Sequence, residues 1–278
     1  MALGIAASRA GGVSANTGTM TRATHCGNAG RMGLEAALLA AKGFTGHADI
    51  FEHPAGYVAV CFGEGFDLEA VTRDFGSPYR MVDPGIAIKK YPSQYSTHRG
   101  IDAALELRQT YNIDPAQIAS VHIETPVMRY TDRGAPQTGL EGKFSFQYTV
   151  ASALLDGHIH MGTFTDEQVR RPAIAEILAK TRVRMDPTIP ANFDEMRTIV
   201  SVQMRDGKEY SVRCDRPRGI WGNPLSRDER RTKVRQCTSR VLPAADIERL
   251  ITMVEDLEHA SSLDVSALIG LLAQSPAS

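Results

Sequence analysis

The spacing of apolar residues in the first part of the chain predicts one long helix and two short ones. They are expected over residues 3–10, 25–42 and 67–75. On the longest of them, Leu34, Leu38 and Ala41 recur at helical spacing and are expected to form its buried face. A stretch that contains several prolines and glycines follows over 76–93, with a strand-like run at 85–91. This stretch is the first candidate domain boundary.

The middle of the chain alternates between helical and strand-like patterns, which is typical of an α+β domain. Alternating residues on both sides of Asp206 and Gly207 predict a β-hairpin over 198–214. The other expected elements are, in chain order, a helix from 93 or 96 to 111, a strand over 119–125, a helix over 143–155, a helix that begins after Thr165 and a strand over 181–185.

Beyond residue 219 the pattern is helical again. Ser226 and Glu229 have the spacing of a capping box at the start of a basic helix, and further helices are expected over 244–259 and 264–273. The order of helical, mixed and helical segments predicts a mixed α and α+β fold in which an inserted α+β domain interrupts a helical domain. The expected segments are 1–88 for the first part of the helical domain, 89–218 for the inserted domain and 219–278 for the returning helices.

Composition narrows the classes of partner. The 278 residues include 31 lysines and arginines against 32 acidic residues, and a formal charge of −1 gives no electrostatic footprint for nucleic acid or an anionic membrane. No apolar run is long enough to span a membrane, and the N-terminal residues lack the basic and apolar regions of a signal peptide. We therefore expect a cytoplasmic protein with no nucleic-acid partner and no membrane partner.

The sequence offers little for a metal or a nucleotide. No two cysteines have zinc-site spacing, so we expect free and mostly buried thiols at Cys26, Cys61, Cys214 and Cys237. His158 and His160 resemble half of a metal site, but nothing nearby in sequence completes it. Glycine-rich phosphate loops are absent as well. No metal site and no cofactor are expected.

The strongest candidate chemistry lies between residues 89 and 99. Lys89 and Lys90 stand just before a predicted helix, and His98 and Arg99 fall in its first turn. Basic residues at this end oppose the helix dipole, so a sequence selected only for stability would place acids there. Together with the free backbone N–H groups, these cations would bind a carboxylate or a phosphate. The alternative is that the side chains point into water and bind nothing.

A second candidate is a polar stripe on the helix predicted over 25–42. His25, Arg31 and Glu35 fall on one side of it. Arg31 is suited to grip a carboxylate with two hydrogen bonds, and His25 to move a proton near neutral pH. The alternative for His25 is a local hydrogen bond at the helix start. Tyr148, in an early turn of the helix predicted over 143–155, has apolar neighbours and is more typical of a core residue than of a catalyst.

Several blocks of this sequence resemble the MmgE/PrpD family, in order and over essentially the whole chain. They are Ser14-Ala-Asn-Thr-Gly-Thr-Met-Thr-Arg22, His25-Cys-Gly-Asn-Ala-Gly-Arg31-Met-Gly33, residues 36–46, Ile88-Lys-Lys-Tyr-Pro92 with Ser96-Thr-His98, Gly142-Lys-Phe-Ser-Phe-Gln-Tyr148, and the region of Phe164-Thr-Asp166 and Arg171-Pro172. Many blocks in register are far more specific than any single motif.

The resemblance carries expectations for fold and function. The family includes 2-methylcitrate dehydratases, cis-aconitate decarboxylases and iminodisuccinate epimerases, which act on small dicarboxylates or tricarboxylates without a metal or an organic cofactor. Its fold is a large helical domain with an inserted α+β lid domain, and its members are usually homodimers. The order of elements predicted above agrees with this fold.

The resemblance also implies roles for single residues. Lys89 matches the active-site lysine at the junction with the lid, and Tyr148 matches the lid tyrosine that faces the substrate. His25 and His98 match histidines of the family pattern. Arg31 falls where the decarboxylase branch has a lysine, which keeps the charge but changes the reach, so the substrate is expected to depend on it.

The implied mechanism is a lyase reaction next to a carboxylate. Arg31, Lys89 and Lys90 would bind the carboxylates and stabilise the negative charge that builds as a proton leaves the neighbouring carbon. The acid and the base are expected among the tyrosine and the two histidines just named, and their order stays open. Dehydration of a 2-methylcitrate-type substrate and decarboxylation of a cis-aconitate-type substrate both fit. Epimerisation of an iminodisuccinate-type substrate is an alternative that shares the first step.

A third alternative is not catalytic. The family pattern begins upstream of this sequence with a helical region that supplies an acidic, histidine-containing motif, and no such motif is found here. We therefore also expect a chain that pairs with a copy of itself, or with a partner that supplies those helices, and acts as a scaffold.

Overall fold

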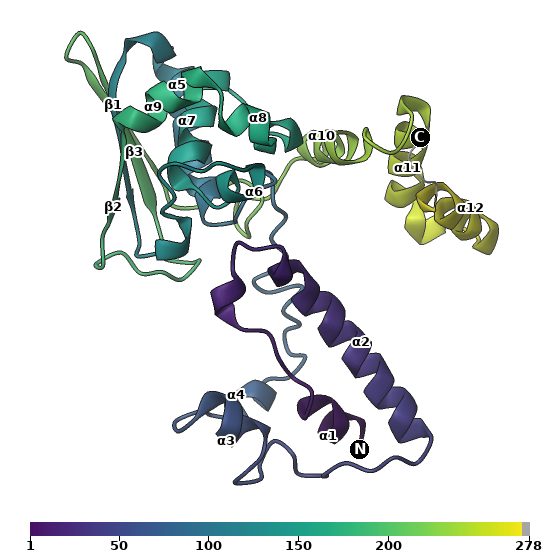
Figure 1. Cartoon of the computed structure of the whole chain (residues 1–278). Helices are drawn as coiled ribbons and strands as arrows, with labels where there is room; N and C mark the ends of the chain where they lie inside the picture. The colour runs from purple at the N-terminus through teal and green to yellow at the C-terminus, as the bar shows by residue number, and fades with distance from the viewer. Residues whose placement is uncertain (274–278) are drawn as a thin grey trace. The chain divides into compact units, whose positions relative to one another are not determined.

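The computed structural model describes residues 1–273, and the chain divides into two compact units, Met1–Gly85 and Ile86–Ser278. Figure 1 labels their elements. The first unit contains α1 (Ala2–Ala7), the 3-10 turn Ser14–Asn16, α2 (Thr21–Ala41), α3 (Tyr57–Phe62) and α4 (Glu69–Thr72). No helix within residues 1–273 is both long enough and apolar enough to cross a membrane.

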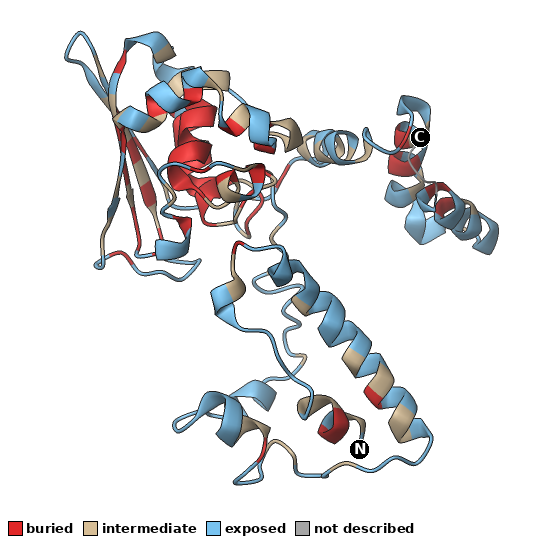
Figure 2. Ribbon diagram, viewed as in Figure 1, coloured by how far each residue is buried: buried red, intermediate tan, exposed pale blue. Residues whose placement is uncertain are grey.

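The first unit buries little of its apolar surface. α1 packs on α2, where Ile5 and Ala36 are buried. The buried face expected for α2 is wrong, because Leu34 and Leu38 are 63% and 56% exposed. Figure 2 shows α2 exposed along most of its length. The physical reason is that α1 covers only one short part of α2, and no other described element covers the leucine face.

The second unit is built on a four-stranded sheet. Its strands are β1 (Ile118–Thr125), β2 (Thr181–Met185), β3 (Thr198–Met204) and β4 (Glu209–Cys214), in the spatial order β2-β1-β3-β4. β1 and β2 are parallel, so the chain must cross over between them, and the other pairs are antiparallel. The predicted strands and the hairpin at Asp206 and Gly207 are confirmed.

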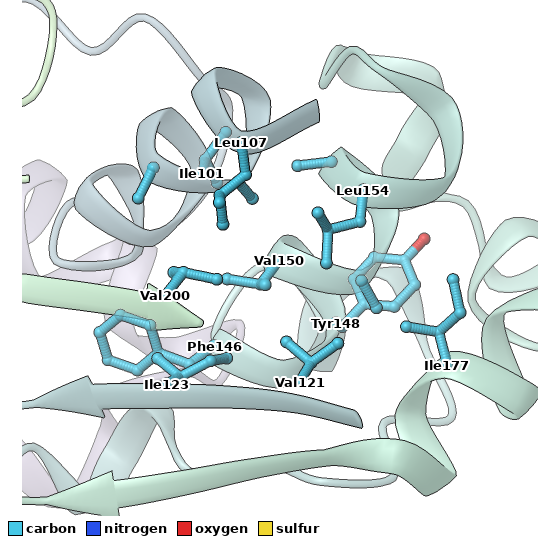
Figure 3. Packing of buried hydrophobic residues seen from close by; sticks show 14 of the residues in the cluster. Ile101, Leu107, Val121, Ile123, Phe146, Tyr148, Val150, Leu154, Ile177 and Val200 are labelled. Carbon is cyan, nitrogen blue, oxygen red and sulfur yellow. The ribbon is translucent and has the colours of Figure 1, made fainter. Parts of the chain in front are cut away.

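Helices cover one face of this sheet. The crossover and its neighbours comprise α5 (Thr97–Tyr111), α6 (Gly139–Gly142), α7 (Phe146–Asp156), α8 (Asp166–Val169) and α9 (Pro172–Lys180), with short 3-10 turns at Pro115–Gln117, Arg129–Thr131 and Met161–Phe164. α5, α7 and α9 contact each other or the strands, and nearly all of α7 is buried. Figure 3 shows Val150 and Val200 facing one another between α7 and β3. This core holds the start of α5 in place.

Two predictions about this unit are wrong. The helix expected after Thr165 is two helices, α8 and α9, because Pro172 has no N–H to continue the first one. The strand-like run at 85–91 forms no strand. It makes one backbone hydrogen bond to a distant segment, from Ile88 N to Gly219 O at 2.7 Å, instead of a ladder.

The last helices follow the prediction closely. They are α10 (Arg227–Thr238), α11 (Ala244–Glu255) and α12 (Ser262–Leu272), with a 3-10 turn at Leu257–His259. Ser226 and Glu229 form the expected capping box. α11 and α12 bury a small cluster of their own, made of Leu242, Ile247, Leu250, Ile251, Leu268 and Leu271. The mixed helix-and-sheet fold is confirmed, whereas the inserted lid and the return of 219–278 to a helical domain stay predictions.

Truncating a core residue of the second unit should destabilise it strongly. Leu107 is fully buried on α5, and Leu107→Ala is expected to lower the free energy of unfolding by about 2–5 kcal/mol because it leaves a cavity. Leu140, which is 37% exposed, is the matched control, and Leu140→Ala should cost well under half as much. Urea unfolding followed by the fluorescence of Trp221, the single tryptophan, measures both. Equal losses would contradict the packing described.

Candidate functional site

The segment from Lys89 to Arg99 turns sharply into α5, and its own polar side chains shape the turn. Ser93 Oγ and Thr97 Oγ1 lie 2.9 Å apart, and Thr97 Oγ1 also donates to Gln94 O at 2.7 Å. Gln94 Oε1 accepts a hydrogen bond from Ser96 N at 2.6 Å. These short local bonds satisfy groups at the start of the helix that have no partner within it.

His98 is fully buried in the first turn of α5. Its ring lies 5.2 Å from the ring of Tyr91 and 4.9 Å from that of Tyr95, and neither ring nitrogen has a hydrogen-bond partner. Burial, and after it the positive charge of Lys89, lower the pKa of His98 to about 3. The imidazole is therefore neutral at physiological pH.

Arg99, the next residue, is also fully buried. Its guanidinium donates from Nε to Asp215 O at 2.9 Å and from NH2 to Phe193 O at 2.8 Å, while the remaining nitrogen is unpartnered. The alternative in which His98 and Arg99 point into water is therefore wrong. Arg99 is thus a cation buried at the positive end of a helix dipole, which stability alone does not explain.

Lys89 lies beside this turn with two further lysines. Its ammonium donates to Ser93 O at 3.1 Å, and Lys233 Nζ donates to the main-chain oxygen of Lys89 at 2.5 Å. Partial burial, then the charges of Lys233 and Lys143, lower the pKa of Lys89. Within residues 1–273, none of these three lysines forms an ion pair with a carboxylate. We call Lys89, Lys143 and Lys233 the lysine cluster.

Sequence reasoning missed two members of the lysine cluster. Lys143 stands two residues before Ser145, the N-cap of α7, so a basic residue at a helix start was again the signal. Lys233 lies inside α10 among other basic residues, and only the folded chain distinguishes it from them.

Lys90, by contrast, is paired. Its ammonium lies 3.0 Å from Glu229 Oε1, and Glu229 also accepts hydrogen bonds from the guanidinium of Arg218. The pKa of Glu229 is lowered to about 2, mainly by its hydrogen bond with Arg218 and further by the main-chain N–H of Ser226 and the Lys90 ammonium. Lys90 therefore carries a charge that the protein itself already offsets.

Two cavities adjoin this region. The larger, of about 720 Å³, lies along α5 and includes Lys90, Tyr91, Asp102, Arg216 and Arg218 in its lining. The smaller, of about 370 Å³, lies between α5 and α10 and also includes Lys90 and Tyr91, together with Glu229 and Lys233. Volumes of this size are typical of sites for small organic ligands.

The other predicted site residues are placed differently. Tyr148 is fully buried, its hydroxyl donates to the main-chain oxygen of Thr163, and burial raises its pKa. Figure 3 shows its ring among Val121, Leu154 and Ile177. The structure therefore brings Lys89 and His98 together at one turn, with Lys90 beside them, while Tyr148 lies in the core.

His25 and Arg31 belong to the first unit and lie on α2. Arg31 is exposed and pairs with Glu35 at 2.6 Å, one helical turn away. His25 is half-buried beside Gly12, where an added Cβ would lie 3.1 Å from its ring. These contacts are local to the first unit.

Metal ligands do not gather in the described chain. His158 and His160 stack with ring centroids 4.9 Å apart, and each Nδ1 is engaged by a nearby backbone group. Across residues 1–273, no group of three or more histidine, cysteine or acidic side chains is arranged to hold an ion. The four thiols are free, as expected. The prediction that most of them are buried is wrong, because Cys26, Cys61 and Cys237 are exposed. They lie on helices whose outer faces no described element covers.

Family models match both parts of the chain. The MmgE/PrpD N-terminal domain matches residues 1–69, and the MmgE/PrpD C-terminal domain matches residues 91–259. The chain belongs to the MmgE/PrpD family. The resemblance noted in the sequence is thereby confirmed, and the two matched regions lie on either side of the division between the structural units.

Several curated relatives of this MmgE/PrpD chain are named cis-aconitate decarboxylases. Cis-aconitate decarboxylase of Mus musculus is 34% identical over 278 residues, which covers 98% of this chain and 56% of the relative. Cis-aconitate decarboxylase of Homo sapiens is 32% identical with the same coverage, and that of Aspergillus terreus is 23% identical over 98% of this chain and 58% of its own length. The chain thus spans about half the length of the curated relatives it matches.

The neutral burial of His98 predicts a loss of stability in acid. In the unfolded state His98 binds a proton below about pH 6.5, whereas in the native state it stays neutral down to about pH 3. The free energy of unfolding should therefore fall by up to about 1.4 kcal/mol for each pH unit as the pH drops from about 6.5 to about 3. His98→Gln should flatten the slope, whereas His158→Gln, at an exposed position, should keep it. Urea unfolding from pH 7 to pH 4 measures the slopes. A slope unchanged in His98→Gln would contradict the account.

Proposed function

We propose that this chain carries the lid-side half of a lyase site for a small dicarboxylate or tricarboxylate, and that the reaction needs no metal or organic cofactor. The observation that carries the proposal is the lysine cluster. Lys233 and Lys143 lie close enough to Lys89 to lower its pKa, beside a neutral, buried histidine, and among the described residues none of the three lysines has a carboxylate as its partner. A multiply charged organic anion would supply the missing negative charge.

Each residue of the turn has a task in this proposal. Lys89 binds a carboxylate and stabilises the negative charge that develops on the neighbouring carbon, while Lys143 and Lys233 bind the remaining carboxylates. His98 supports the turn as a neutral group and adds no charge that would repel Lys89.

Decarboxylation is the favoured reaction within this class. The mouse and human relatives are named cis-aconitate decarboxylases. This supports decarboxylation over dehydration of a 2-methylcitrate-type substrate and over epimerisation. In that reaction the bond to one carboxylate breaks and carbon dioxide leaves. The electron pair moves along the allylic carbons, and one proton is added to give a five-carbon dicarboxylate.

A single charge removal tests the proposal. Lys89→Gln should lower cis-aconitate turnover by about 10²-fold or more, because it removes the cation next to the developing charge. Lys208→Gln, on the exposed β3–β4 turn, removes an equal charge and should leave turnover within about twofold. Carbon dioxide release by the full chain measures both variants, before and after dialysis against a chelator.

Ligand binding can be measured by thermal unfolding even where turnover is slow. Millimolar citrate or cis-aconitate should raise the thermal unfolding midpoint of the wild-type chain and of Lys208→Gln, but not that of Lys89→Gln. Equal stabilisation of all three proteins, or loss of turnover after chelation, would contradict the proposed site.

The exposed leucines of α2 favour a second candidate, a scaffold that pairs with another chain. Leu34 and Leu38, with Phe62 and Phe75 of the same unit, expose apolar surface that association would bury. The partner would be a second copy, giving a homodimer, or a chain that supplies covering helices. Size-exclusion chromatography distinguishes the candidates: a stable complex together with no tricarboxylate stabilisation would favour the scaffold over the lyase.

A further inference from the structure

α10 contacts both lysines of the Lys89–Lys90 pair from one of its faces. Glu229 Oε1 lies 3.0 Å from the ammonium of Lys90, and Lys233 Nζ donates to the main-chain oxygen of Lys89 at 2.5 Å. Residues four apart in a helix lie one above the other, so Glu229 and Lys233 reach neighbouring residues of the turn. One contact engages a side chain and the other the backbone.

Glu229 is itself held on several sides. It accepts a hydrogen bond from Ser226 N at 2.8 Å as part of the capping box, and others from the guanidinium of Arg218. The main-chain N–H of Arg218 donates to Asp102 Oδ2 at 2.7 Å, and Asp102 Oδ1 accepts from the hydroxyl of Tyr91 at 2.5 Å. The bonds therefore run from α10 back to the residue that follows the lysine pair.

These hydrogen bonds give the two adjacent lysines different environments. The charge of Lys90 is offset by Glu229, whose carboxylate stays ionised because its pKa is about 2. The ammonium of Lys89 has no such partner in the described chain, and the hydrogen bond it donates goes to a neutral carbonyl, Ser93 O. The charged groups that face it are Lys233 from α10 and Lys143 before α7, with the neutral His98 from α5.

We propose that Glu229 and Lys233 are positioning residues that make the two lysines unequal. Glu229 holds Lys90 in an ion pair, and Lys233 holds the backbone of Lys89 while its positive charge favours release of the Lys89 proton. Of these two adjacent lysines, Lys89 is then the one whose ammonium no carboxylate of the described residues holds, so it is available to an anion. The inference rests on the proposed function, since it names what orients the lysine of that same site.

Reactivity of the two amines tests the inference without requiring turnover. The full chain is labelled with trace acetic anhydride between pH 7 and pH 11, and fragmentation of the peptide that contains both lysines gives the extent of labelling at each. At pH 8 in the wild type, Lys89 should be labelled to a greater extent than Lys90, because Glu229 holds the Lys90 ammonium.

Three variants separate charge from fold. Lys233→Met should lower the extent of Lys89 labelling, because the charge of Lys233 helps to lower the pKa of Lys89, and Lys233→Arg should restore it, because arginine keeps both the charge and the donor. Glu229→Gln should raise the extent of Lys90 labelling, because it removes the carboxylate that holds the Lys90 ammonium. Arg240→Met removes an equal charge just beyond α10, at an exposed position, and should leave the labelling of both lysines unchanged.

Circular dichroism and the unfolding midpoint of each variant identify any that fail to fold, and the Lys233→Met and Lys233→Arg pair provides a second comparison. Equal labelling of Lys89 and Lys90 in the wild type, or Lys89 labelling unchanged by Lys233→Met in a folded protein, would overturn the inference.

Substrate protection separates this inference from the proposed function. Cis-aconitate at millimolar concentration should slow acetylation of Lys89 more than that of Lys90. Unequal labelling of the two lysines that responds to the variants, with no protection of Lys89 by cis-aconitate, would overturn the proposed function while the positioning of the lysines stands.

Discussion

Positive charge that has no carboxylate partner among the described residues is the constraint around which the second unit is organised. Lys89, Lys143 and Lys233 share a neighbourhood, and burial together with mutual repulsion lowers the pKa of Lys89. Such an arrangement opposes folding, since like charges repel and desolvation disfavours the charged form. Elsewhere on the chain, basic side chains form ion pairs with carboxylates, as Arg231 does with Glu255.

The surrounding packing makes that arrangement possible. α5 and α7 lie on the sheet through a core that includes Ile101, Leu107 and Phe146, so the first turn of α5 cannot move away from its neighbours. Buried within that turn, His98 stays neutral and thereby avoids a further repulsive charge. The ion pair with Glu229 then fixes Lys90, while Lys89 has no carboxylate partner within residues 1–273.

Local patterns predicted much of this. The alternation around Asp206 and Gly207, the capping box of Ser226 and Glu229, and the helical period of α5 all carry their signal within a few residues, and the structure has each of them. The basic residues at the start of α5 were visible for the same reason, because their conflict with the helix dipole is local.

What the sequence could not show depends on contacts between distant segments. Glu229, 139 residues away, forms an ion pair with Lys90 and not with Lys89. No spacing rule in the sequence distinguishes the two lysines. The exposure of Leu34 on α2 was missed because helical period shows which face is apolar, not whether another element covers it. Tyr148 carried two interpretations in the sequence, and the fold places it in the core.

Calorimetric titration of the full chain with propane-1,2,3-tricarboxylate, at low and at high salt, measures the central claim most directly. The account predicts binding that weakens as ionic strength rises, that is absent for the uncharged triamide of the same acid, and that is lost when Lys89, Lys143 and Lys233 are replaced together by glutamine. Equal binding of the acid and the triamide, or undiminished binding to the triple variant, would contradict it.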